Sequence, residues 1–95
     1  MCEHLEKLAG YLRTRGIRET YRGQVWTENC REWIYFDCVL DIQALESKLG
    51  FDPCVRSFRN DDARSGREAG FYCELCKDAI VGFHPDDAEG KVLIS

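Results

Sequence analysis

Two cysteines three positions apart make residues 71–84, FYCELCKDAIVGFH, the chemically most informative segment of this 95-residue chain. Cys73 and Cys76 form a C-x-x-C pair within it. Such a pair occurs in zinc sites, in redox-active dithiols and in disulfide frameworks. The residues that surround the pair help to choose among these three kinds of chemistry.

The residues after the pair favour a zinc site. A redox-active C-x-x-C lies where a strand gives way to a helix, whose N-terminus lowers the pKa of the thiol. Here Cys76 is followed by KDAIVGF, in which two β-branched residues and a glycine are poor helix formers. A zinc knuckle instead takes two thiolates from a tight turn, so that both sulfurs reach one ion at about 2.3 Å. We therefore predict a hairpin from Phe71 to Phe83 with C-E-L-C as its turn.

Structural zinc needs four ligands, so two more residues must join Cys73 and Cys76. Cys2 and His4 form the other closely spaced cysteine–histidine pair of the chain. Zinc ligands often come in such short-spaced pairs. The sequence therefore predicts a Cys₃His zinc site made of Cys2, His4, Cys73 and Cys76.

A second ligand set remains open. His84 follows Cys76 after seven residues, and either Cys54 or Cys38 would then be the fourth ligand. We do not expect Cys38 in this role. Its position on an apolar strand predicts a side chain that is buried in the core, where free cysteine is common. We therefore expect Cys38 to contribute to stability and not to metal binding.

The expected compartment indicates whether the six cysteines form disulfides. The N-terminal residues MCEHLEK contain neither a basic region nor a continuous apolar region of a signal peptide. We expect a cytoplasmic protein that does not enter a membrane, and a reducing cytoplasm makes a three-disulfide framework unfavourable. The net charge of -4 argues against nucleic acid as a partner and leaves another protein as the expected one.

The expected function is that of a small zinc-binding protein whose metal is structural and which binds a macromolecular partner. The alternative is a thiol–disulfide oxidoreductase or redox sensor, in which Cys73 attacks and Cys76 resolves. The sequence lacks a glycine-rich phosphate loop, a G-x-S-x-G elbow and an H-E-x-x-H motif. An enzyme is accordingly the less favoured class.

The elements that position these residues follow from apolar periodicity. A helix is predicted over residues 3–15, because its apolar residues recur at i, i+3, i+4 and i+7, and Gly16 is suited to end it. A second helix is predicted from its N-cap Asp41 to Gly50. Aromatic and β-branched residues predict strands at 21–27, 31–39 and 54–58.

Together these elements predict one α+β domain over residues 1–95, with two helices against an antiparallel sheet and the order α-β-β-α-β-β-β. The strand at 31–39 should lie inside the sheet, because both of its faces are apolar. Residues 28–30 should form a hairpin turn. The polar segment 59–70 should be a loop, and the part from Asn60 to Gly70 should be the most mobile internal segment of the chain.

Overall fold

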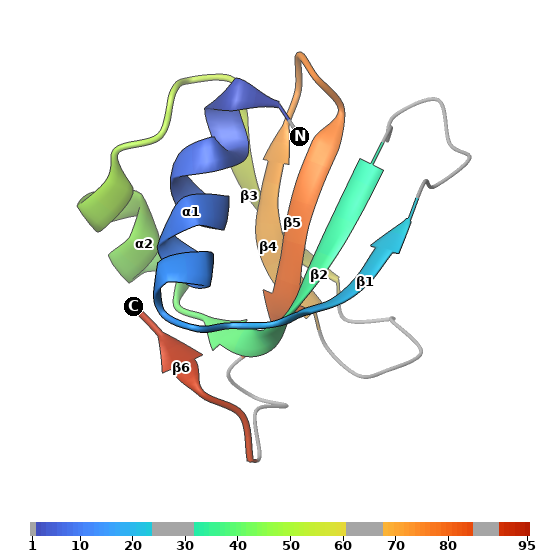
Figure 1. Cartoon of the computed structure of the whole chain (residues 1–95). Coiled ribbons are helices and arrows are strands. Elements are labelled where there is room, and N and C mark those ends of the chain that lie inside the picture. The colour runs from blue at the N-terminus through green and yellow to red at the C-terminus, as the bar shows by residue number, and fades with distance from the viewer. Residues whose placement is uncertain (1, 24–31, 61–67, 85–89) are drawn as a thin grey trace.

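The computed structural model describes residues 2–23, 32–60, 68–84 and 90–95, and its main element is a mixed sheet with both helices on one face (Figure 1). The strands are β1 (Glu19–Gly23), β2 (Glu32–Leu40), β3 (Val55–Asn60), β4 (Glu68–Cys73), β5 (Asp78–Phe83) and β6 (Leu93–Ile94). Their order is β1-β2-β5-β4-β3, and β6 pairs with the end of β2. The chain is therefore a small α+β protein, which agrees with the predicted class.

The first helix starts as a 3₁₀ turn over Glu3–Leu5 and continues as α1 over Glu6–Thr14. Its apolar face is buried, as its periodicity predicts: Leu5, Leu8, Ala9 and Leu12. Gly16 follows with a φ of 77°, a left-handed conformation that glycine adopts without steric cost. This 3₁₀ turn contains His4 and directly follows Cys2, and both residues are predicted zinc ligands.

The second helix, α2, spans Ile42–Leu49 and has the predicted caps. The side chain of Asp41 accepts a hydrogen bond of 3.2 Å from the backbone N–H of Ala44. Gly50 ends the helix with a φ of 60°. After this glycine, Phe51 to Cys54 connect α2 to β3, and the segment passes the first turn of the N-terminal helix (Figure 1).

Strand β2 lies inside the sheet between β1 and β5, as predicted. Its residues alternate between the two faces, and those on the helix-covered face are buried: Ile34, Phe36, Cys38 and Leu40. They form the core with α1, with Leu45 of α2, with Ile80 of β5 and with Phe71 of β4. On the opposite face, Trp33 and Tyr35 are half-buried.

The sheet is mixed, and our prediction of an antiparallel sheet was wrong. Strand β2 runs parallel to β5, with Ile34 opposite Ile80, and parallel to β6, with Val39 opposite Leu93. The remaining pairs, β1 with β2, β3 with β4 and β4 with β5, are antiparallel. Side chains alternate with a period of two in both kinds of pairing, so the sequence pattern does not report the direction of a partner strand.

The predicted loop at 59–70 is shorter in the structure. Arg59 and Asn60 belong to β3 and pair with Ala69 and Glu68 of β4, because polar side chains are compatible with a strand at the edge of a sheet. The prediction of a mobile segment between Asn60 and Gly70 lies largely outside the described residues, and the predicted turn at 28–30 lies wholly outside them. Within the described part of the chain, no helix is long and apolar enough to cross a membrane.

Candidate metal centre

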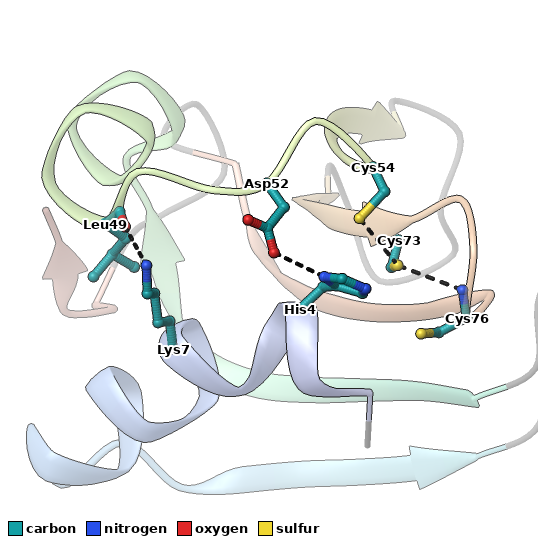
Figure 2. A network of polar contacts seen from close by, with 7 residues as sticks. All are labelled: His4, Lys7, Leu49, Asp52, Cys54, Cys73 and Cys76. Atoms are coloured by element: carbon teal, nitrogen blue, oxygen red, sulfur yellow. Dashed lines mark hydrogen bonds and ion pairs between the residues drawn. The ribbon is translucent and has the colours of Figure 1, made fainter.

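Three segments that are distant in the sequence meet at one end of the sheet. They are the N-terminal residues Cys2 to Leu5, the connection from α2 to β3, and the turn between β4 and β5. Figure 1 shows the N-terminus beside this turn, and Figure 2 shows side chains from all three segments approaching one another.

The turn between β4 and β5 holds Cys73 and Cys76. The backbone N–H of Lys77 donates to the carbonyl oxygen of Cys73 at 2.9 Å, and Lys77 has a φ of 64°. The N–H of Cys76 points at Cys73 and lies 3.4 Å from its Sγ atom (Figure 2). A sulfur that accepts from backbone N–H groups is stabilised as a thiolate, which is the form that binds metals.

Cys2 is held beside this turn by a buried carboxylate. Its backbone N–H donates to Oδ2 of Asp78 at 2.8 Å. Asp78, the first residue of β5, is only 6% exposed, and its Oδ1 atom has no hydrogen-bond partner among the described residues. Cys2 itself is extended, with φ -71° and ψ 145°, and its carbonyl oxygen accepts from the N–H of Leu5 at 3.1 Å. These contacts bring the Cys2 thiol close to Cys73 and Cys76.

His4 points into the site from the 3₁₀ turn. Its Nδ1 atom lies 2.8 Å from Oδ2 of Asp52, in the connection between α2 and β3. Figure 2 shows the imidazole ring between Asp52 and the thiols of Cys54 and Cys73. Because a carboxylate only accepts hydrogen bonds, Nδ1 is the donor and Nε2 is left without a hydrogen in the neutral ring. A histidine in this state can bind a metal through Nε2.

Cys54 approaches from the other side of Cys73. Val55 pairs with Cys73 in the register of β3 and β4, and the N–H of Glu74 donates to the carbonyl oxygen of Cys54 at 2.9 Å. The two Sγ atoms of Cys54 and Cys73 are 3.9 Å apart. Cys54 is thus placed by backbone contacts at the start of a strand, and its thiol is part of the cluster.

The five side chains form two groups of three that share Cys73. One group is Cys2, Cys73 and Cys76, and the other is His4, Cys54 and Cys73. Within each group the ligand atoms lie within 4.8 Å of one another. Both groups could hold a metal ion. Although Cys2 and His4 are close in the sequence, the structure places them in different groups.

The pKa values of the thiols differ according to their surroundings. Burial alone would raise the pKa of Cys73, but hydrogen bonds from the N–H groups of Cys76 and Leu75 and from neighbouring thiols lower it below its ordinary value. Hydrogen bonding to Cys2, together with burial, raises the pKa of Cys76 to about 12. Burial raises the pKa of Cys2 and of Cys54. Among the thiols that the structure describes, Cys73 is therefore the one whose surroundings favour the thiolate.

His84 and Cys38, two residues of the second predicted ligand set, lie apart from the C-x-x-C turn. Strand β5 runs away from the C-x-x-C turn, so His84 after its last residue is about 20 Å from that end of the strand. Cys38 lies in β2 next to Val39, which is opposite Phe83 at this same far end of β5. Among the described residues, neither His84 nor Cys38 belongs to a group of possible metal ligands. Burial raises the pKa of Cys38 to about 12, consistent with a residue of the core.

Sequence reasoning did not find Asp52 and gave Cys54 only as an alternative ligand. The two residues flank Pro53 directly after the second helix, so a carboxylate and a thiol two positions apart were the available signal. This spacing is a weak signal, because Asp52 and Cys54 come close to His4 and Cys73 only when β3 pairs with β4. No protein-family model, no curated protein and no solved structure matches this chain.

Proposed function

We propose that this protein binds one zinc ion in a structural site formed by Cys2, His4, Cys73 and Cys76. The observation that carries the proposal is that Cys2, Cys73 and Cys76 form one group of possible metal ligands, and that His4 lies in a second group that shares Cys73. Thiolates and imidazoles are the ligands that zinc prefers, and a Cys₃His set is common in structural sites. The zinc would join the N-terminal helix to the β4–β5 turn.

The spacing of the thiols supports an ion of this size. Zinc–sulfur bonds of about 2.3 Å place two sulfurs of a tetrahedral site about 3.8 Å apart. The thiols of the proposed ligands Cys2, Cys73 and Cys76 lie within 4.8 Å of one another. A modest contraction of this group would give the sulfur spacing that one zinc ion requires.

His4 is favoured over Cys54 as the fourth ligand because Asp52 already orients its ring. Histidine ligands of zinc commonly donate their other ring N–H to a carboxylate, which selects the tautomer and makes the ligand more basic. The Nδ1 contact with Asp52 at 2.8 Å is of this kind.

The site has the features of a structural centre. Four protein ligands fill the coordination shell of zinc and leave no position for a substrate. Cys73 is completely buried, and the remaining four residues of the cluster are half-buried. We propose that the partner is another protein, since the net charge of -4 opposes binding of nucleic acid. The metal-bound turn would present Leu75, which is 72% exposed, to this partner.

Metal analysis of protein purified without chelator tests the proposal. We expect about one zinc per chain, released when a mercurial reagent titrates the thiols. The Cys73→Ser variant should lose the zinc, whereas the matched control Cys38→Ala, which removes a core cysteine, should keep it. A protein that is free of zinc and cannot be loaded with it would contradict the proposal.

A thiol–disulfide oxidoreductase is the second candidate, because hydrogen bonds lower the pKa of Cys73. Its thiolate would attack a substrate disulfide, and Cys76 would then resolve the mixed disulfide, which gives one protein disulfide and two substrate thiols. The segment after Cys76 is strand β5 and not a helix, so the helix dipole that assists such enzymes is missing here. Alkylation of Cys73 in zinc-loaded protein separates the two candidates: slow reaction supports the zinc site, and fast reaction supports the redox function.

A further inference from the structure

One donor of the cluster is left over by the proposed zinc site. With Cys2, His4, Cys73 and Cys76 on the zinc, the thiol of Cys54 remains 3.9 Å from the sulfur of Cys73. The five donors are also not arranged around one centre. They form two groups of three, and Cys73 alone belongs to both. An ion that prefers three ligands would use this arrangement more completely than zinc does.

We propose that the cluster also binds two Cu(I) ions, bridged by the thiolate of Cys73. One ion would take Cys2, Cys73 and Cys76, and the other would take Cys73, Cys54 and the Nε2 atom of His4. Cu(I) is a soft ion that selects thiolate and imidazole ligands, and with thiolates it commonly adopts three-coordinate geometry. Each group of three then completes the shell of one ion.

Cys73 has the properties that a bridging ligand needs. A thiolate sulfur carries three lone pairs and can bond to two ions at once. The N–H of Cys76 lies 3.4 Å from its sulfur, and such a donor stabilises the negative charge of a thiolate. Its position at the end of β4 brings it within reach of Cys54 in one group and of Cys2 and Cys76 in the other.

The binding step involves no oxidation or reduction. Four thiols lose their protons, His4 binds as neutral imidazole, and two Cu⁺ ions bring the charge of the centre from -4 to -2 by simple counting. With zinc, three thiolates and one Zn²⁺ give -1 by the same counting. Because the two Cu(I) ions together take all four ligands of the proposed zinc site, the protein cannot hold both Cu(I) ions and the zinc. Uptake of Cu(I) must therefore release the zinc.

The inference rests on the proposed metal site and is tested on the full chain without oxygen. Zinc-loaded protein is titrated with Cu(I), supplied as its acetonitrile complex and buffered by a Cu(I) chelator of known affinity. A zinc indicator follows the release of zinc. We expect about two Cu(I) bound per chain and about one zinc released. A Cys30→Ser background removes the cysteine that lies outside the described residues.

Variants then separate the two groups. Cys54→Ser should keep its zinc, because Cys54 is not a zinc ligand, but its capacity should fall to about one Cu(I) per chain. The control Cys38→Ala should bind both ions. Unchanged copper capacity in Cys54→Ser would overturn the proposal, and so would binding of only one Cu(I) by the wild-type protein.

X-ray absorption of the wild-type protein tests the bridge without any substitution. We expect about three ligands per copper and a short copper–copper scattering path. A spectrum that lacks this path would overturn the bridged pair. If the purified protein holds no zinc, the proposed zinc function fails, while the titration of metal-free protein still decides whether two Cu(I) ions bind.

Discussion

The Nδ1 atom of His4 lies 2.8 Å from Oδ2 of Asp52, and this contact joins residues 48 positions apart. It connects the 3₁₀ turn at the N-terminus to the segment that follows α2. The contact leaves Nε2 of His4 as the ring nitrogen that faces the thiols (Figure 2). Asp52 thus orients a possible metal ligand without belonging to either group of possible ligands.

Replacing Asp52 should therefore weaken zinc binding. We expect Asp52→Ala to lower the zinc affinity roughly tenfold or more, because carboxylates that orient a histidine ligand have effects of this size. Asp37→Ala is the matched control, since the carboxylate of Asp37 pairs with Lys91 at 2.6 Å instead. Competition with a zinc indicator measures both variants. Equal affinities would show that Asp52 does not orient the ligand.

The two histidines of the chain should respond differently to substitution. His4→Ala should lower both the zinc affinity and the melting temperature, because it removes a proposed ligand. His84→Ala should change neither by much, since β5 separates it from the C-x-x-C turn. Zinc stoichiometry and thermal unfolding measure both effects. Loss of zinc in His84→Ala together with retention in His4→Ala would reverse the ligand assignment.

In the zinc-free protein, the contribution of His4 to the free energy of unfolding should depend on pH. The hydrogen bond with Asp52 raises the pKa of His4, and Cys73 and Glu3 act in the same direction. A raised pKa in the folded state contributes stability below the unfolded value of about 6.5, and this contribution disappears as pH rises through the raised pKa. Wild type should therefore exceed His4→Ala in stability at about pH 5.5 and match it at about pH 9.

Urea unfolding of the two zinc-free proteins at both pH values measures this difference. The thiols titrate in both proteins, so their contribution largely cancels. Zinc binding should show the opposite trend, because a protonated His4 cannot bind the metal. A stability difference that grows with pH would contradict the assigned direction.

Cys38 should matter for stability and not for metal binding. Its side chain is completely buried on the face of β2 that carries Ile34 and Phe36. Cys38→Ala leaves a small cavity there and should lower the free energy of unfolding by about 1 kcal/mol, with unchanged zinc content. Denaturant unfolding and metal analysis test the two halves of this prediction. Loss of zinc would place Cys38 among the ligands.

Removal of zinc should loosen the first helix as well as the turn. A metal that joins His4 to Cys73 closes a loop of roughly 70 residues, a constraint worth about 4 kcal/mol in the chain-entropy model of cross-links. Chelation should therefore accelerate hydrogen exchange at Leu8 and Leu12 of α1 more than at Ile34 in the centre of the sheet. Equal acceleration at all three positions would indicate global destabilisation instead.

The sequence predicted the helices and the central strand well because these depend on local patterns. Asp41 and Gly50 bound α2 through capping interactions with residues only a few positions away. The buried face of β2 follows from the alternation of Ile34, Phe36 and Cys38. Such features need no knowledge of which strand lies beside which.

To predict the parallel pairing and the grouping of the possible ligands, one must know which strands lie side by side. Nothing in the local pattern around Ile34 indicates that Ile80 lies opposite in the parallel direction. The same holds for Cys54, which reaches Cys73 only because Val55 pairs with that cysteine across β3 and β4. The strand Leu93–Ile94 has two residues, too few for a periodicity.

The parallel pairing of β2 with β5 also bears on the order in which the chain folds. The β4–β5 hairpin is made of neighbouring residues, and hairpins form within about 1–10 μs. The β2–β5 pairing must close a long loop that contains α2, β3 and β4, and such non-local pairings form slowly. We therefore expect Cys73 and Cys76 to meet a metal ion while the chain is still largely unfolded, with Cys2 and His4 joining the ion last.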